Sequence, residues 1–125
     1  MINIQKFLKS VPFAWEGIIT LFKSENNAKI HLLAVVVVVI SGFWIGFSEG
    51  ECLAIILTMG GVLALEAVNT AIEALVDLTS PEFHPLAKKA KDVAAGAVLI
   101  FVFGALAVAG VILWNHFNHI LSSIL

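Results

Sequence analysis

The sequence predicts an all-α membrane protein with three transmembrane helices preceded by an amphipathic interfacial helix. The 125 residues are 60% hydrophobic and 13% charged, with a mean hydropathy of +1.02. A water-soluble domain of this size would leave too much apolar surface in contact with water. Three long apolar stretches follow residue 29, and the segment before them has apolar residues at helical spacing. The length allows one domain, so we expect residues 1–125 to form a single membrane domain.

Residues 1–29 form the amphipathic segment. Apolar side chains recur every three or four residues on one helical face, and lysines and other polar residues occupy the opposite face. This pattern is typical of a helix in the membrane interface, and packing against the bundle is the alternative. Pro12 lacks a backbone donor, so we expect it to kink or divide the helix. The segment lacks the continuous apolar core of a secretory signal, so we expect no cleavage.

The three apolar stretches predict transmembrane helices over about 30–47, 52–78 and 90–116. A span needs roughly 20 residues, and residues 93–114 alone contain no charged side chain. The second stretch is long enough only if Glu66 lies inside the span. Small residues such as Gly96, Gly104 and Gly110 in the third stretch favour close helix packing, and so small a bundle favours self-association.

The positive charges predict the orientation. All seven are lysines, and they precede either the first or the third span. They are Lys6, Lys9, Lys23, Lys29, Lys88, Lys89 and Lys91. The positive-inside rule therefore predicts a cytoplasmic N-terminus and second loop, with the C-terminus outside.

The second span contains a row of oxygen-bearing side chains. Glu66, Asn69, Glu73 and Asp77 fall within a narrow angular range at about 100° per residue, so they share one helix face. We call these four residues the acidic row. An ionisable residue within the bilayer costs roughly 2.5–3.5 kcal/mol and is usually functional. A carboxylate that serves only helix packing is the structural alternative for Glu66.

Further charged residues at the same predicted interface suggest phosphoryl transfer. Glu25 precedes the first span, and Lys91 and Asp92 begin the third. Carboxylate and amide oxygens suit Mg²⁺ bound together with phosphate oxygens, and a lysine suits phosphate. Gly60-Gly61 lacks the spacing of a P-loop. Any nucleotide site in this chain must therefore be unconventional.

Three segments of the chain resemble the small bacterial membrane lipid kinases, which include diacylglycerol and undecaprenol kinases. They are residues 65–77 (LEAVNTAIEALVD), 82–84 (EFH) and 90–98 (AKDVAAGAV). The resemblance covers nearly the whole chain. It implies an ATP- and Mg²⁺-dependent kinase that phosphorylates the hydroxyl of a membrane lipid alcohol. It also implies a multi-pass protein of the bacterial inner membrane, a homotrimer with active sites shared between subunits, and no nucleic-acid partner.

The resemblance assigns a role to each matching residue. Glu66 corresponds to the catalytic base, and Glu25 and Glu73 correspond to the carboxylates that hold Mg²⁺. The positions that correspond to the nucleotide site or its polar neighbours are Lys6, Glu25, Asn69, Glu73, Asp77, Glu82, His84, Lys91 and Asp92. For Glu82 and His84 a solvated loop is the alternative. Lys6 stands where relatives can carry arginine, which implies a less directional contact.

Asn26 and the Ile30-His31 pair resemble the undecaprenol kinase branch more than the diacylglycerol kinases. No physical argument from the sequence separates these substrates, because both offer one hydroxyl on an apolar tail. Two other classes stay open. A small transporter would use Glu66 to bind a cation, although it would not require the acidic row to continue into water. A non-catalytic scaffold would not require the complete set of charged positions.

Overall fold

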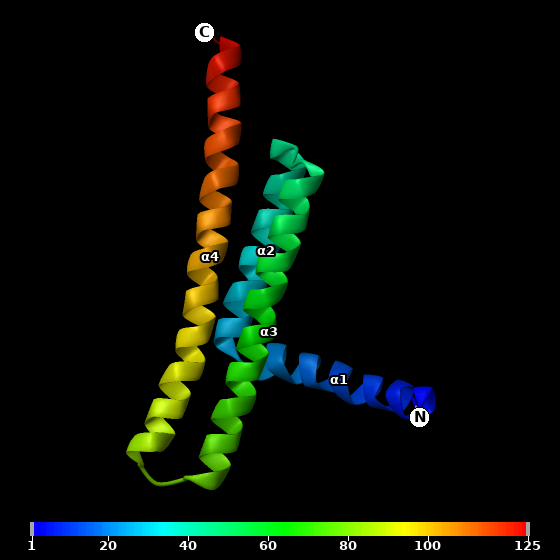
Figure 1. Cartoon of the computed structure of the whole chain (residues 1–125), viewed down its shortest axis with the longest axis vertical. Coiled ribbons are helices and arrows are strands. Elements are labelled where there is room, and N and C mark those ends of the chain that lie inside the picture. Colours follow the sequence, from blue (N-terminus) through cyan, green and yellow to red (C-terminus); the bar gives the residue numbers. More distant parts are fainter. Residues whose placement is uncertain (1, 125) are drawn as a thin grey trace.

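Every regular element in residues 2–124, the part of the chain that the computed structural model describes, is an α-helix. The four helices are α1 (Ile4–Ser24), α2 (Asn26–Ile45), α3 (Glu49–Thr79) and α4 (Pro85–Ile124). The last three are long and apolar enough to cross a membrane. As Figure 1 shows, these three run side by side, and α1 leaves them at a steep angle. The prediction of an all-α protein with three helices that are long and apolar enough to cross a membrane is confirmed.

Helix α1 begins with a side-chain cap and ends at a sharp corner. The Asn3 side chain accepts a hydrogen bond of 2.9 Å from the backbone N–H of Lys6, which satisfies one free donor of the first turn. Glu25, with an extended backbone, separates α1 from α2. Pro12 lies inside α1, and the helix continues through it. Of the two effects expected of Pro12, a kink or a division, the division does not occur. Because this helix is exposed, the carbonyl that Pro12 leaves free can be solvated.

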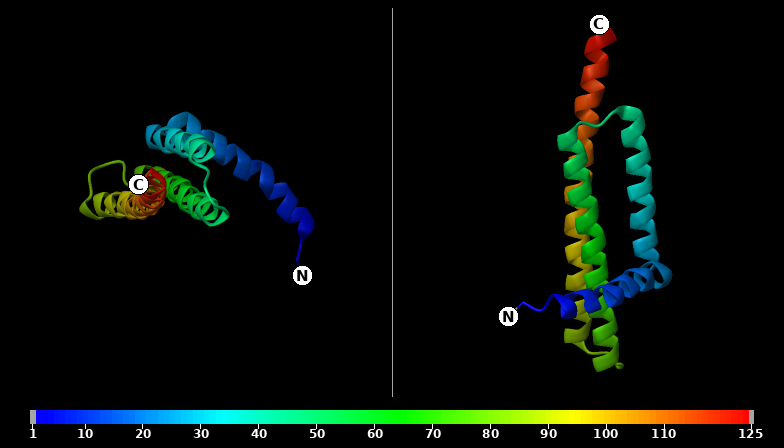
Figure 2. Two further views of the ribbon diagram at one scale, coloured as in Figure 1. Left: turned by 90° about the horizontal axis from the view of Figure 1, so that it is seen from above. Right: turned by 90° about the vertical axis from the view of Figure 1, so that its right-hand side faces the viewer.

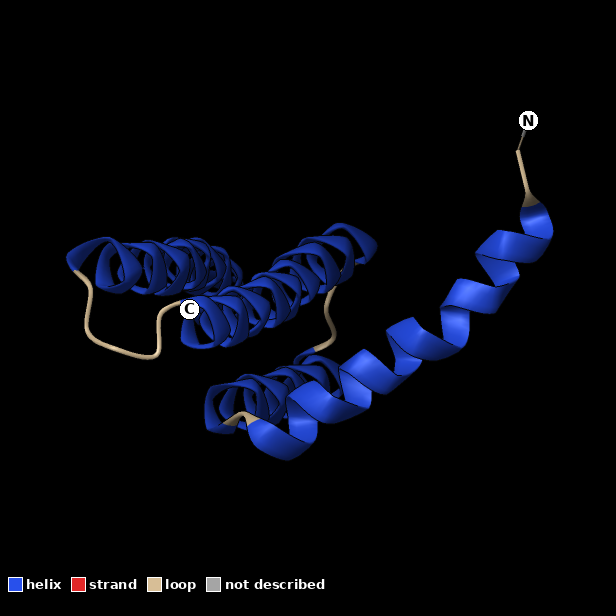
Figure 3. Cartoon of the chain, turned by 90° about the horizontal axis from the view of Figure 1, so that it is seen from below, coloured by secondary structure: helices blue, strands red, loops and turns tan. Residues whose placement is uncertain are grey.

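The N-terminal part of α1 projects away from the other helices. Figures 1 and 2 show this from three directions, and Figure 3 shows it from below. The one buried residue of α1 is Leu21, in its last two turns, where the helix meets α2 and α3. Phe7, Leu8 and Trp15 are exposed. A single chain therefore leaves the apolar face of α1 uncovered.

Helices α3 and α4 form the largest helix–helix contact, and α2 packs on α3. Gly61 lies at a close approach between α3 and α4, because a Cβ atom there would overlap the Phe101 ring. The core is thin, and most large apolar side chains of the spans are exposed. In lipid, exposed apolar side chains carry no free-energy penalty. Close helix packing at small residues therefore provides much of the stability that a hydrophobic core provides in water.

A closed polar network ends the bundle where α2 turns into α3. Gly46 adopts a left-handed backbone with φ of 78°, which favours glycine, and Ser48 begins α3. The Ser48 hydroxyl accepts from the Glu51 backbone N–H while the Glu51 carboxylate accepts from the Ser48 backbone N–H, a capping box. His116 of α4 pairs with Glu51 at 3.2 Å. Beyond this point α4 extends past the other helices (Figures 1 and 2).

Candidate active site

The site is centred on two buried polar side chains of α3. Glu66 is 3% exposed and Asn69 is 6% exposed, and these are the buried polar residues in the described part of the chain. They lie one turn apart on the face of α3 that also buries Val62. A buried carboxylate costs free energy unless neighbouring groups compensate for the lost water. The surroundings of Glu66 therefore decide what it can do.

Glu66 faces the corner between α1 and α2. Asn27, the second residue of α2, lies within hydrogen-bonding reach of its carboxylate. Glu25, at the corner itself, His31, one turn further along α2, and Glu73 all lie close enough to interact with Glu66 electrostatically. The structure thus brings together three carboxylates that are separated by as many as 48 positions in the sequence. Such a cluster repels itself unless a cation or a proton compensates.

Asn69 and Glu73 continue the row on α3. The Asn69 amide nitrogen donates a hydrogen bond of 3.1 Å to the Glu73 carboxylate. The Asn69 Oδ1 atom is buried and has no hydrogen-bond partner within the chain. A buried oxygen without a donor is rare in folded proteins and requires an explanation. It leaves an acceptor next to Glu73 that a ligand can use.

Lys91 of α4 joins the row from the other side. Its Nζ atom lies 3.0 Å from the Asp77 carboxylate, and Glu73 also lies close enough to interact with it. This pair connects α3 with α4 just before the loop that joins them. The lysine expected to meet phosphate therefore lies at the acidic row of the same chain.

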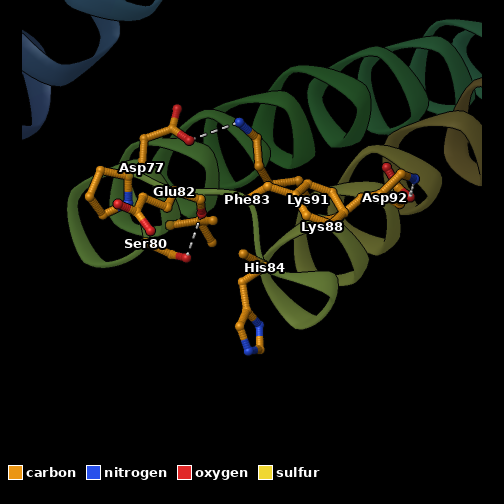
Figure 4. A pocket seen from close by; sticks show the side chains of 11 residues that line it. Asp77, Ser80, Glu82, Phe83, His84, Lys88, Lys91 and Asp92 are labelled. Carbon is orange, nitrogen blue, oxygen red and sulfur yellow. Dashed lines mark hydrogen bonds and ion pairs between the residues drawn. The ribbon is translucent and has the colours of Figure 1, made fainter.

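An open pocket of about 450 Å³ lies between the ends of α3 and α4. Figure 4 shows the polar side chains around it: Asp77, Ser80, Glu82, His84, Lys88, Lys91 and Asp92. Asp92 is bonded to Lys88 rather than to Lys91. The His84 ring points away from the Asp77–Lys91 pair, and its Nδ1 atom accepts from the backbone N–H of Leu86 at 3.2 Å. His84 thus caps the start of α4 in this conformation.

Within one chain, Lys6 does not lie near the other predicted site residues. It lies in the first turn of α1, at the end that points away from the bundle (Figure 1). The remaining predicted residues divide into a buried group around Glu66 and an exposed group around the pocket. Glu73 connects the two groups, since it interacts with both Glu66 and Lys91.

The sequence analysis missed two residues that the structure adds. Lys88 lines the pocket and pairs with Asp92, four residues later. That spacing is a standard helical ion pair and could have indicated it. Asn27 lies within reach of Glu66, but no spacing within α2 indicates a contact with α3.

The donor atoms fit a hard divalent cation that takes part of its ligands from elsewhere. No cluster of three or more histidine, cysteine or acidic side chains that could hold a metal by itself occurs within residues 2–124. Glu25, Glu73 and the unpartnered Asn69 Oδ1 are all oxygen ligands. Mg²⁺ usually takes only one or two protein carboxylates and completes its shell with water and substrate phosphates. An incomplete protein ligand set is what such a cation requires.

The acidic row extends along the bundle from the level of α1 towards the α3–α4 loop. Because Glu25 and Asn27 both interact with Glu66, the α1–α2 corner lies at the level of Glu66. Glu73 and Asp77 lie roughly 10 Å and 16 Å further along the α3 axis at about 1.5 Å per residue. In Figures 1 and 2, α3 and α4 accordingly continue past α1 to their connecting loop.

A family model described as prokaryotic diacylglycerol kinase matches residues 12–113. The chain belongs to this family. The undecaprenol kinase of Bacillus subtilis (strain 168) is 45% identical over 99 residues, which cover 79% of this chain and 80% of that protein. The diacylglycerol kinase of Escherichia coli (strain K12) is 30% identical over 113 residues, 90% of this chain and 93% of that protein.

A third relative is longer than this chain. The diacylglycerol kinase of Synechocystis is 38% identical over 107 residues, which are 85% of this chain but 61% of that protein. Membership of the family makes this chain a lipid kinase, and the apolar helices make it a membrane protein. The kinase interpretation of the acidic row is thereby favoured over the transporter and the scaffold.

Proposed function

We propose that this lipid kinase transfers the γ-phosphoryl group of ATP to the hydroxyl of a membrane lipid alcohol in a Mg²⁺-dependent reaction at the cytoplasmic membrane surface. The observation that carries the proposal is the burial of Glu66 beside Asn27, with an acidic row leading from it to a lysine-lined pocket. The buried end suits a lipid hydroxyl, and the exposed end suits a nucleotide. The two reactants thus approach the site from different phases.

Glu66 is the general base in this proposal. It takes the proton of the lipid hydroxyl as the hydroxyl oxygen bonds to the γ-phosphorus, and the bond from that phosphorus to the β–γ bridging oxygen breaks. ADP and the lipid phosphate are the products. A positioned base contributes typically about 100-fold to 10,000-fold to a rate. The burial of Glu66 near the α1–α2 corner supports a meeting with a hydroxyl at the edge of the lipid phase.

The pocket between α3 and α4 binds the nucleotide. Lys91 moves from Asp77 to the phosphates, with Lys88 and Asp92 beside it and Glu82 and His84 on the loop. Asp77 keeps Lys91 at the pocket when no nucleotide is bound. Asn69 supports the site through its bond to Glu73.

Glu25 and Glu73 would hold Mg²⁺ together with phosphate oxygens. When bound, the cation neutralises charge on the transferring phosphoryl group. Its presence would also relieve the repulsion among the three carboxylates around Glu66. The unpartnered Asn69 oxygen supports this assignment, because it lies beside Glu73 and is available as a further acceptor.

We place undecaprenol ahead of diacylglycerol as the lipid substrate. The support is the 45% identity to an undecaprenol kinase against 30% to the Escherichia coli diacylglycerol kinase, together with Asn26, Ile30 and His31. Lysine placement supports a cytoplasmic N-terminus in the bacterial inner membrane. The exposed apolar face of α1 supports its position in the membrane interface.

The protein acts as a homotrimer in this proposal, with each site completed by a neighbouring subunit. The position of Lys6 supports this, since α1 carries it away from the pocket of its own chain. The exposed apolar surface of the spans supports association as well. Chemical crosslinking in detergent micelles, read by gel electrophoresis, tests the assembly. Trimers are expected, and exclusively monomeric protein would contradict it.

Purified protein in mixed micelles with ATP, with and without Mg²⁺, tests the reaction. Labelled phosphate should appear in undecaprenol and, more slowly, in diacylglycerol, and only with Mg²⁺ present. Folded protein that phosphorylates neither lipid would overturn the proposed function. Faster transfer to diacylglycerol at equal lipid concentration would reverse the order of substrates alone.

A further inference from the structure

One face of α2 meets the buried carboxylate with two nitrogen-bearing side chains. Asn27 and His31 are four residues apart, so they lie on the same side of this helix. Asn27 lies within hydrogen-bonding reach of Glu66, and His31 lies close enough to interact with it electrostatically. Both residues lie outside the acidic row and the pocket that the proposed function uses.

The surroundings of His31 support an interaction with Glu66. A partly open cavity of about 180 Å³ lies between α2, α3 and α4, and His31 is the one polar side chain that lines it in the described part of the chain. Val62 also lines this cavity, and Glu66 follows Val62 by one turn of α3. The polar imidazole therefore lies between apolar walls and a buried carboxylate. His31 is half-buried, and a polar group removed from part of its water takes a polar partner when one is in reach.

A general base at Glu66 needs support of this kind. A carboxylate accepts up to about four hydrogen bonds, and a base must lie within hydrogen-bonding reach of the proton that it takes. Glu25 and Glu73, which carry the same charge, repel it. Donors on α2 counteract that repulsion and set the direction of the carboxylate. From α4, only apolar residues line the cavity beside His31.

We propose that His31 and Asn27 are positioning residues that hold the Glu66 carboxylate in the orientation in which it takes the proton of the lipid hydroxyl. The proposal rests on the proposed function, because it requires Glu66 to be the base. Each residue acts through Glu66 and contacts neither ATP nor the transferred phosphoryl group. Their loss should therefore slow turnover without weakening nucleotide binding.

Kinetics of single variants test the proposal. His31→Leu and Asn27→Leu should each lower kcat about 10-fold to 100-fold, the range for loss of a hydrogen bond to a charged group. The KM for ATP should stay within about two-fold, because binding of the nucleotide is untouched. His31→Gln keeps an N–H donor and should retain much more activity than His31→Leu. Equal losses in His31→Gln and His31→Leu would contradict a hydrogen-bonding role.

A matched variant separates positioning from packing. Val35→Ala enlarges the same cavity from the next turn of α2 but removes no donor. It should leave kcat unchanged even if the unfolding temperature falls. A loss of kcat in Val35→Ala as large as in His31→Leu would show that cavity packing, rather than the imidazole, matters, and would overturn the proposal.

The double variant His31→Leu with Glu66→Gln decides whether His31 acts through Glu66. Its residual turnover, measured with labelled ATP, should equal that of Glu66→Gln alone, because the carboxylate that His31 positions is already absent. Losses that multiply would assign His31 an independent role and contradict the proposal. An active Glu66→Gln variant would instead remove the proposed function itself. An inactive Glu66→Gln with a fully active His31→Leu would remove only the positioning role.

Discussion

At the end of the bundle where α2 turns into α3, the polar side chains are bonded to each other. Where α3 turns into α4, several of them instead face an open pocket. The first end consists of Ser48, Glu51 and His116, and the Glu51 carboxylate accepts from Ser48 and meets the His116 ring. At the second end Lys91 pairs with Asp77. About two turns before Asp77 on α3, the side-chain oxygen of Asn69 has no hydrogen-bond partner within the chain. Both ends contain a carboxylate paired with a basic side chain on α4.

The difference teaches how to separate structural from functional polar residues in a thin bundle. A network whose members satisfy one another closes a turn and needs no ligand. A row of carboxylates with an unpartnered amide oxygen and a half-exposed lysine at an open pocket is incomplete without cations and phosphate. The carboxylates of the acidic row repel one another, so the row by itself does not stabilise the fold. Substitutions at the two ends should accordingly separate turnover from stability.

The largest effect is expected from Glu66→Gln. The amide keeps the size of the side chain but cannot take a proton, so turnover should fall by about 100-fold to 10,000-fold. Transfer of labelled phosphate to lipid measures this. Crosslinking and the unfolding temperature are the controls, and both should match the parent protein. Near-normal turnover would show that the base is another group and would remove the contrast between the two ends.

A smaller effect on a different kinetic parameter is expected from Lys91→Met. Loss of the charged donor to phosphate should lower kcat/KM for ATP by about 10-fold to 100-fold. Lys89→Met is the matched control, because Lys89 is exposed two residues away and does not line the pocket. Equal effects of the two variants would mean that general positive charge, rather than the placement of Lys91 at the acidic row, serves the nucleotide.

The part of this site that lies on one helix could be predicted from the sequence. Residue spacing at 100° per residue places Glu66, Asn69 and Glu73 on one face, and the Asn69–Glu73 bond agrees. Apolar length likewise predicted the three helices that are long and apolar enough to cross a membrane. Both properties depend on local geometry, which a periodic pattern determines.

Contacts between helices could not be derived in this way. The Asn27–Glu66 contact depends on the angle at the α1–α2 corner, and the Asp77–Lys91 pair depends on how the α3–α4 loop folds. His84 shows the same limit, since its role as a cap follows from the backbone of that loop. The family resemblance placed Asp77, His84 and Lys91 at one site, but it did not indicate Asn27 or the capping role of His84.

The contact between α3 and α4 at Gly61, which lies between the two ends, offers a stability test with little effect on turnover. Gly61→Ala places a methyl group against the Phe101 ring and should cost about 1–3 kcal/mol in overpacking. Gly60→Ala is the matched control, because a Cβ at Gly60 meets nothing within 4 Å in the chain. Unfolding in denaturant measures both. Phe101→Ala should abolish the cost of Gly61→Ala. A more damaging Gly60→Ala would assign the small residues to contacts between copies instead.

The smallest effect is expected at the closed end. Glu51→Ala removes the carboxylate of the capping box and the partner of His116, so the unfolding temperature should fall by roughly a few degrees. Turnover measured below that temperature should stay within about two-fold of the parent value, because nothing at this end meets a reactant. Glu51→Gln, which keeps an acceptor for the Ser48 N–H, should lose less stability than Glu51→Ala. If Glu51→Ala instead lowered turnover as strongly as Lys91→Met, the network of Ser48, Glu51 and His116 would take part in catalysis. A polar network that satisfies itself would then not be a sign of a purely structural role.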